Sequence, residues 1–156
     1  MGVNRSISAL KPILAERLKA FLAYCDKVKF PVVVVETDRL QIVQDAYYAQ
    51  GRANIEKVNW LRNIAGLYLI KERENKIITN ALVSNHTGGG AVDMCPEIPG
   101  KPCHPWWNAS DEIWRQMGGM AETFGLDWCA GGYGQTWGKG WDNPHFELLE
   151  DWKEAA

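Results

Sequence analysis

Apolar positions near the N-terminus recur every three or four residues, which is the spacing of one face of an α-helix. These positions are Leu10, Ile13, Leu14, Leu18, Phe21, Leu22 and Cys25. Pro12 is compatible with this helix because proline fits the first turn. The run PVVVVET (31–37) is typical of a buried strand. Residues 38–51 predict a second helix, with Gly51 as its C-cap.

Short apolar stretches and turn-forming residues alternate in the second half of the chain. KIITNAL (76–82) predicts a strand that leads into a glycine-rich loop, and AVDM (91–94) predicts a strand that leaves it. HFELLE (145–150) predicts a last strand, whereas residues 52–76 are mixed and predict no element. Helices before, between and after short strands indicate an α+β domain.

A third helix is predicted after residue 107. Asn108 or Ser110 would cap its start, and Gly125 would end it. Its apolar face would consist of Ile113, Met117, Met120 and Phe124. Gly118 and Gly119 would each destabilise the helix by about 1 kcal/mol relative to alanine, so it needs tertiary support.

Two long segments predict loops. CPEIPGKPCHP (95–105) contains four prolines and must be irregular. The glycine-rich stretch 129–144 is long for a loop inside a compact domain, which favours a functional role. Trp137 and Trp141 lie in it, and we place them at a substrate cleft.

Composition and charge narrow the class of protein. The 156 residues fit one domain, taken as 1–156. Seventeen basic and nineteen acidic residues give 17 − 19 = −2, which gives no support for a nucleic-acid partner. The N-terminus lacks the uninterrupted apolar core of a secretion signal, and the longest apolar run is far too short to span a membrane. We therefore expect a monomer that is made in the cytoplasm.

The histidines carry the candidate chemistry. His86 and Asp93 flank a run of three glycines, and His145 follows Asp142 by three residues. Two imidazoles and one carboxylate suit a zinc site that keeps a fourth position for water. Zinc lowers the pKa of such a water to roughly 7. A bend at 143–144 would bring Asp142 to the same side as His145, where it could act as a general base.

Three segments together resemble a known family. SNHTGGGAVD fits the pattern Ser-x-His-x-x-Gly-x-Ala-x-Asp through Ser84, His86, Gly89, Ala91 and Asp93. DNPHFE (142–147) resembles the element Asp-x-Pro-His-Phe-Glu. ETDRLQIVQDAYYAQGR (36–52) resembles the arginine-bearing segment, with Arg39, Gln44, Tyr48, Gln50, Gly51 and Arg52 in register. The family is the LAS group of zinc peptidoglycan peptidases, and the resemblance covers about residues 31–148.

The resemblance implies a role for each matching residue. One zinc ion would be bound by His86, Asp93 and His145. Asp142 would be the general base, and Arg39 would stabilise the oxyanion. Ser84 and Gln44 would contact the bound peptide. The implied fold is a small antiparallel sheet flanked by helices, with the zinc site at the sheet edge in a cleft.

The implied substrate is a peptidoglycan stem peptide. The Asp-x-x-His spacing at 142–145 resembles the L-alanyl-D-glutamate endopeptidase branch. The expected protein is a phage or prophage endolysin that acts in the periplasm or cell wall after release, without a wall-binding module. Two departures from the family stand out. Leu40 follows Arg39 where relatives have Ser or Thr, and the loop between Trp128 and Asp142 is longer than usual.

Several alternatives stay open. The same scaffold also carries D-Ala-D-Ala carboxypeptidases. A ligand set of two histidines and one aspartate also suits a non-haem Fe(II) oxygenase. A non-catalytic wall-binding module could also keep the zinc fold. Cys95, Cys103, His104 and Cys129 could form a second zinc site. Cys95 and Cys103 could instead form a disulfide. Ordinary thiols are the favoured interpretation, and Cys25 is expected in the core.

Overall fold

The computed structural model describes residues 3–129 and 143–149. Their elements, in chain order, are η1 (Ile7–Ala9), α1 (Pro12–Lys27), β1 (Val32–Glu36), α2 (Gln41–Ala49), α3 (Ile55–Ile64), η2 (Glu72–Glu74), β2 (Ala91–Pro96), α4 (Asp111–Glu122), β3 (Leu126–Trp128) and β4 (His145–Leu148). The predicted first helix begins with Pro12 in its first turn, as expected, and Ser110 caps α4 by accepting a hydrogen bond from the Ile113 N–H.

The strands form one antiparallel sheet in the order β1-β2-β4-β3. The predicted α+β class and the small antiparallel sheet are confirmed. Asp93 of β2 lies opposite Glu36, the last residue of β1, and also opposite His145, the first residue of β4. Polar residues from three strands therefore meet at one end of β1 and β4.

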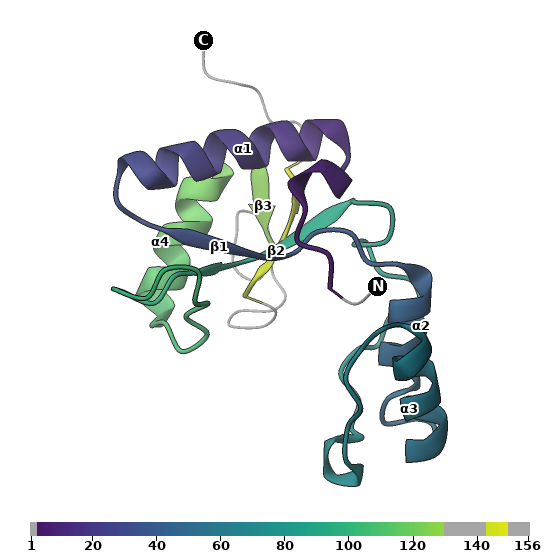
Figure 1. The fold of residues 1–156 in the computed structure, drawn as a ribbon. Helices are drawn as coiled ribbons and strands as arrows, with labels where there is room; N and C mark the ends of the chain where they lie inside the picture. The colour runs from purple at the N-terminus through teal and green to yellow at the C-terminus, as the bar shows by residue number, and fades with distance from the viewer. Residues whose placement is uncertain (1–2, 130–142, 150–156) are drawn as a thin grey trace.

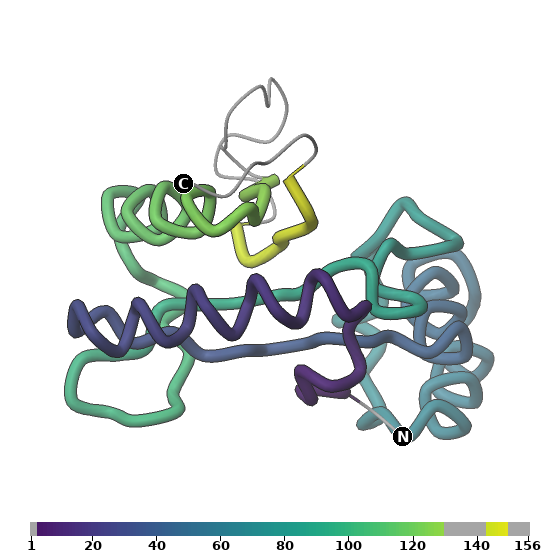
Figure 2. Tube along the Cα trace, turned by 90° about the horizontal axis from the view of Figure 1, so that it is seen from above, coloured from purple at the N-terminus to yellow at the C-terminus, as the bar shows by residue number. Residues whose placement is uncertain are grey.

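The main core lies between the sheet and the helices α1 and α4 (Figures 1 and 2). Its fully buried side chains include Leu14, Leu18 and Phe21 of α1, Met117 of α4, and Val92, Leu126 and Phe146 of the strands. The indole of Trp128 packs against Gly118, where a Cβ atom would lie 2.3 Å from the ring. This contact supplies the tertiary support that the glycine pair in α4 requires. We call α1, α4 and the sheet the sheet body.

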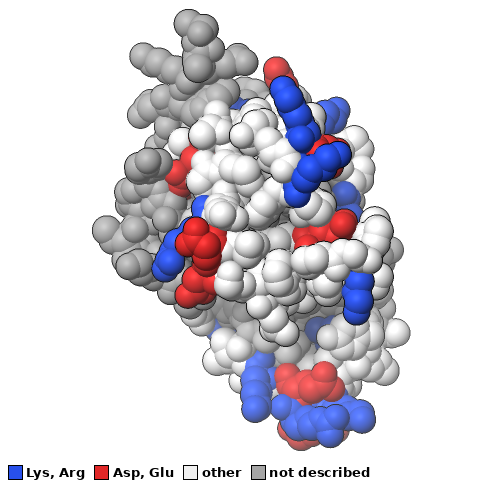
Figure 3. Space-filling view, turned by 90° about the vertical axis from the view of Figure 1, so that its left-hand side faces the viewer, with Lys and Arg blue, Asp and Glu red and all other residues white. Residues whose placement is uncertain are grey.

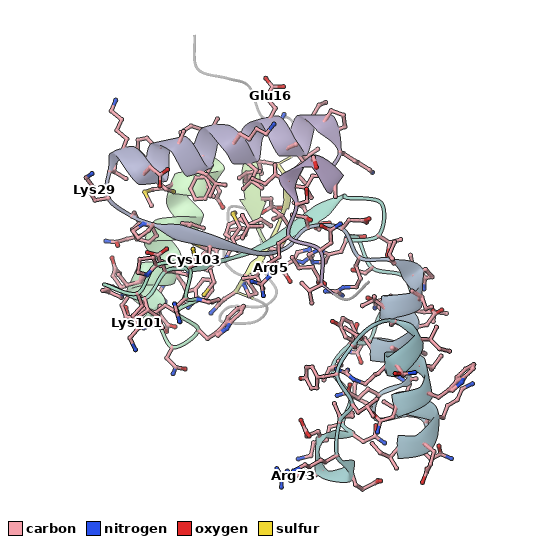
Figure 4. All side chains as sticks on the ribbon, viewed as in Figure 1. Arg5, Glu16, Lys29, Arg73, Lys101 and Cys103 are labelled. Carbon is pink, nitrogen blue, oxygen red and sulfur yellow. The ribbon has the colours of Figure 1, made fainter. Side chains whose placement is uncertain are left out.

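Helices α2 and α3 stand apart from the sheet body (Figure 1). With the turn η2 they form what we call the α2–α3 lobe, residues 41–76, and Arg73 marks its far end (Figure 4). Gly51 follows the end of α2 with a positive φ of 81°, as the predicted C-cap requires. The mixed segment 52–76, which predicted no element, contains α3 and η2.

The prediction of a strand over 76–82 is wrong. This segment runs past the lobe without a strand partner, and its carbonyl groups accept hydrogen bonds from side chains instead. Arg52 donates to the Thr79 carbonyl at 3.0 Å, and Gln44 donates to the Ala81 carbonyl at 2.5 Å. Ile77 and Ile78 are more than half exposed, so their apolar character reflects no buried sheet. Strand β3 was not predicted, because three residues are too short for a periodic pattern.

The four cysteines all lie within the described residues and form no disulfide with one another, which agrees with the interpretation as ordinary thiols. Cys25 and Cys95 are buried in the main core, and burial raises the pKa of the Cys25 thiol to about 12 and that of Cys95 to about 11. Cys103 is exposed in the proline-rich loop (Figure 4) and cannot pair with buried Cys95 in this arrangement. The structure thus gives no support to the alternative of a disulfide.

The surface carries both signs of charge in close proximity. On the face drawn in Figure 3, basic side chains lie beside acidic ones and form no single-sign patch. Within residues 3–129 and 143–149, no helix has both the length and the apolar run that crossing a bilayer requires.

Candidate metal centre

Asp93 and the two predicted histidine ligands come from three different segments. Asp93 lies in the middle of β2, His145 begins β4, and His86 lies in the loop that precedes β2. Residues 143–144 form a turn directly before His145, as the predicted bend at Pro144 requires. The three residues that are distant in sequence thus meet where β4 begins.

The glycine-rich loop places His86 by a tight reversal of the chain. Gly88 and Gly89 have φ angles of 84° and 79°, in the left-handed region that favours glycine. At Gly89 a Cβ atom would lie 2.4 Å from the carbonyl oxygen of Ala9, so the loop packs directly on residues 9–11, which lead from η1 into α1. Asp38 fixes the other side of the loop by accepting a hydrogen bond from the Gly88 N–H at 3.0 Å.

The three predicted ligand atoms converge on one point. The distance from His86 Nε2 to Asp93 Oδ1 is 3.1 Å, and from His145 Nδ1 to the same oxygen it is 3.5 Å. The two imidazole nitrogens lie 3.2 Å apart. Ligand atoms about 2.0–2.1 Å from a tetrahedral zinc ion lie about 3.3 Å from one another. The spacing of the three side chains therefore fits a tetrahedral zinc ion.

A second feature of the site also fits a cation. Asp93 Oδ1 is buried and makes no hydrogen bond of good geometry, although an unsatisfied buried oxygen is unfavourable. Burial alone would raise the pKa of Asp93, but the adjacent imidazoles of His145 and His86 oppose it and hold that pKa well below its usual range. Asp93 is therefore an ionised carboxylate aimed at two imidazoles, which is a donor set that zinc prefers.

The hydrogen bond at His86 Nδ1 determines that Nε2 is the nitrogen available to bind a metal ion. His86 Nδ1 lies 3.3 Å from the backbone carbonyl of Thr37, which can only accept a hydrogen bond. The proton therefore belongs on Nδ1 and the lone pair on Nε2, the atom that faces Asp93. Thr37 is fully buried and is itself held by the carbonyl of Asn4.

Arg39 lies beside the three ligands with its guanidinium held from two sides. Its Nε and Nη2 atoms donate to Glu36 Oε1, and its Nη1 atom donates to Gln44 Oε1 at 2.9 Å. The Arg39 backbone N–H donates to the His86 carbonyl at 3.1 Å, so the arginine and the ligand loop are connected. The guanidinium carbon also lies 5.0 Å from the centre of the Tyr47 ring. Arg39 is therefore a positioned, partly buried charge at the site.

Gln44 supports Arg39 from behind. It is fully buried, and its amide accepts from Arg39 and donates to the Ala81 carbonyl. The predicted contact of Gln44 with the substrate thus stays a prediction, and the structure gives the side chain a role in holding Arg39. Leu40, which takes the place of Ser or Thr, occupies the N-cap position of α2 without a side-chain cap.

A cleft of about 950 Å³ opens in front of the ligands. Its lining includes the three ligands, Arg39, Tyr47, the extended segment 77–81, Val83 and Ser84. Ser84 Oγ accepts a hydrogen bond from the His86 N–H at 3.1 Å, so the predicted substrate contact also orders the ligand loop. The structure brings together His86, Asp93, His145, Arg39 and Ser84, whereas Asp142, Trp137 and Trp141 lie outside the described residues.

Sequence reasoning missed the polar residues that surround the ligands. Thr37 and Glu36 were not singled out, although they lie two and three residues before Arg39. Glu147 was also missed, and it lies 3.7 Å from His145 through Oε2 and Nε2. A pattern could have indicated it, since residues two apart on a strand point to the same face, as in His145-Phe146-Glu147.

Comparison with solved structures places this arrangement in context. The L-Ala D-Glu endopeptidase ChiX of Serratia marcescens superposes with a TM-score of 0.55 at 18% identity, over 91% of this chain and 82% of that chain. The LdcB LD-carboxypeptidase gives 0.55 at 11% identity, over 96% and 64%. The vancomycin resistance D,D-pentapeptidase VanY, in complex with Zn(II), gives 0.53 at 12% identity, over 90% and 72%. The chain has the fold of these peptidases.

At these identities the likeness establishes the fold of the chain and no more. No protein-family model and no curated protein matches the sequence. VanY in complex with D-alanine-D-alanine superposes with a TM-score of 0.50 at 15% identity, over 90% of this chain and 71% of that one. The peptidase fold thus occurs in proteins named for different bonds, and the choice among them depends on the site of this chain.

Proposed function

We propose that this protein is a zinc-dependent peptidase that hydrolyses a bond in peptidoglycan stem peptides. The observation that carries the proposal is the convergence of His86 Nε2, His145 Nδ1 and Asp93 Oδ1 at mutual distances of 3.1–3.5 Å beside Arg39. A zinc ion held by three protein ligands supplies a nucleophilic water at neutral pH and polarises a carbonyl group. The fold shared with peptidoglycan peptidases supports the substrate class.

The protein's own residues divide the remaining work. Hydrolysis forms a C–O bond at the peptide carbonyl and places negative charge on its oxygen before the C–N bond breaks. Arg39 would donate to that oxygen, and Glu36 and Gln44 hold the guanidinium so that little reorganisation is needed. Asp142 would take the proton of the attacking water and pass it to the leaving amine. This role of Asp142 rests on the resemblance of the segment DNPHFE alone.

The preferred bond in this proposal is L-alanyl-D-glutamate. The Asp-x-x-His spacing supports it, as does the size of the cleft, which is at the upper end of the usual range for ligand pockets. The ChiX endopeptidase is among the structures with this fold. The phage endolysin role, and action in the cell wall after cytoplasmic synthesis, belong to the same proposal.

A D-Ala-D-Ala carboxypeptidase is the second candidate. The observation that favours it is the shared fold with VanY, which has been solved with D-alanine-D-alanine. The products separate the candidates, because a carboxypeptidase releases terminal D-Ala and the endopeptidase cuts between the first two residues of the stem.

Substitution of the proposed catalytic residues tests the mechanism. Arg39→Ala should lower kcat/KM on purified muropeptides by about 10²–10³ while zinc stays bound, because one oxyanion donor is lost. Asp142→Ala should lower it by about 10²–10⁴, as expected for loss of a general base. Arg73→Ala, at the far end of the lobe, is the matched control and should keep wild-type activity (Figure 4). Full activity in both active-site variants with bound zinc would overturn the proposal.

A further inference from the structure

The two ring nitrogens of His145 face different surroundings. Nδ1 points to Asp93 and His86, at 3.5 and 3.2 Å. Nε2 points to the opposite side, where Glu147 Oε2 lies 3.7 Å away. That distance is an ion-pair contact and is longer than an ordinary hydrogen bond. The imidazole is thus held between the proposed metal position and a second carboxylate.

Glu147 is itself fixed by two further side chains. Asn85 Nδ2 donates to Glu147 Oε1 at 2.6 Å, and the Cys129 thiol lies 3.5 Å from Glu147 Oε2. Asn85 directly precedes His86 in the ligand loop, whereas Glu147 follows His145 by two residues in β4. The hydrogen bond between Asn85 and Glu147 therefore connects the segments that carry the two histidine ligands.

The proton on His145 follows from these neighbours. When Nδ1 gives its lone pair to a metal ion, the proton of the neutral imidazole is on Nε2, which faces the Glu147 carboxylate, and a carboxylate can only accept a hydrogen bond. His86 shows the same arrangement, with the Thr37 carbonyl in the place of the carboxylate.

We infer that Glu147 is a positioning residue that orients His145 as a metal ligand, and that Asn85 couples Glu147 to the loop that carries His86. Carboxylates that accept a hydrogen bond from a ligand histidine fix its ring orientation and raise its basicity. Glu147 is placed to do this for His145, on the side of the ring away from Asp93. The inference rests on the proposed zinc site, but it does not require a particular substrate.

A second metal ion is the rival explanation of these residues. The ligand atoms of Cys129, His145 and Glu147 also lie within 4.8 Å of one another. Two metal ions would have to share His145 through both ring nitrogens, which requires an imidazole that has lost both protons. In addition, Glu147 Oε1 already accepts the hydrogen bond from Asn85. These two features favour a positioning role for Glu147.

Zinc affinity, measured by competition with a chromophoric chelator at pH 7.5, tests the inference without any activity assay. Glu147→Gln should bind zinc about 10–100-fold more weakly than wild type, because the carboxylate behind His145 is lost. Asn85→Ala should weaken binding in the same direction by a smaller factor. Glu97→Gln is the matched control, since Glu97 accepts a backbone hydrogen bond from Cys103 and contacts no metal ligand. Its zinc affinity should be that of wild type.

The protonation of His145 gives a second readout in the metal-free protein. In ¹⁵N-edited NMR spectra, Glu147→Gln should lower the population of the Nε2–H tautomer of His145 relative to wild type, because the Asp93 carboxylate then attracts the proton to Nδ1 without competition. A purely structural role of Glu147 would leave the tautomer unchanged. Asn85 is exposed, so Asn85→Ala should fold even where Glu147→Gln does not, and it keeps the inference testable.

Three outcomes would overturn the inference. The first is a zinc affinity of Glu147→Gln within about twofold of wild type, and the second is a wild-type affinity in a folded Asn85→Ala when Glu147→Gln fails to fold. The third is a second bound zinc ion that is lost in both Cys129→Ala and Glu147→Gln. If wild type binds one zinc ion tightly and the variants weaken it, but stem peptides are not cut, the inference stands and the proposed function fails.

Discussion

The sheet body and the α2–α3 lobe are held together in different ways. The body has a continuous apolar core, in which side chains of α1, α4 and the sheet are fully buried. The apolar cluster of the lobe is much smaller, with Val43, Ala46 and Ala65 as its fully buried members. Polar side chains in the lobe bind backbone groups instead, as when Asn59 pairs with both the N–H and the carbonyl of Ile70.

This difference is reflected in the site. The three proposed metal ligands come from the sheet and from the loop packed on α1, so they depend on the rigid body. The cleft wall 77–81 is held by side chains of the lobe, Gln44 of α2 and Arg52 in the turn that follows α2, and Arg39 is held by Gln44 as well as by Glu36 of β1. We therefore expect zinc affinity to fall when the sheet body is destabilised. We expect substrate binding and turnover to depend on the α2–α3 lobe.

The largest effect is expected where the ligand loop meets the body. Gly89→Ala places a Cβ atom 2.4 Å from the Ala9 carbonyl at a positive φ, so backbone must move. We expect it to lower the free energy of unfolding by about 3 kcal/mol or more and to weaken zinc binding. Chemical denaturation of the metal-free protein and zinc titration measure both effects.

Gly88→Ala is the matched control for that substitution. Gly88 has a similar φ of 84°, but no atom lies within 4 Å of the position of its Cβ. The backbone conformation alone should lower stability by about 1–2 kcal/mol. Equal losses in the two variants would show that the contact with α1 does not matter for the loop, and would contradict the dependence of the metal site on the body.

A smaller and more local effect is expected in the lobe. Asn59→Ala leaves the N–H and carbonyl of Ile70 without their partners, at a local destabilisation of about 1–3 kcal/mol. Hydrogen exchange should become faster in the lobe and stay unchanged in the sheet. Zinc affinity should be that of wild type. Asn63→Ala, an exposed position on the same helix, is the control. Weaker zinc binding in Asn59→Ala would refute the division between body and lobe.

The same contrast explains what the sequence could predict. Helix α1, strand β1 and strand β4 have regular apolar patterns because they bury one face in the main core. Residues 76–82 have a similar apolar pattern but lie exposed along the lobe, where side-chain hydrogen bonds replace strand pairing. A pattern read along the chain cannot distinguish these two cases, because the partner of the segment is distant in sequence.

The site follows the same rule. His86 and Asp93 could be predicted as a pair because one short loop joins them, and the Pro144 turn indicated how His145 enters. The residues behind the ligands could not be predicted in the same way. Thr37 reaches His86 through a backbone carbonyl, which carries no side-chain pattern. Strand periodicity could place Glu147 on the same face as His145, but its hydrogen bond with Asn85 depends on the pairing of β2 with β4, which periodicity alone does not give.

One measurement tests the central claim most directly: mass spectrometry of purified muropeptides digested by the protein with bound zinc, after chelation, and after zinc is restored. The account predicts cleavage between L-alanine and D-glutamate, loss of cleavage on chelation, and recovery with about one zinc ion per chain. Cleavage that is unchanged after chelation, or no cleavage by the zinc-loaded protein, would contradict the proposed zinc peptidase. Release of terminal D-alanine alone would contradict the assigned bond and favour the carboxypeptidase.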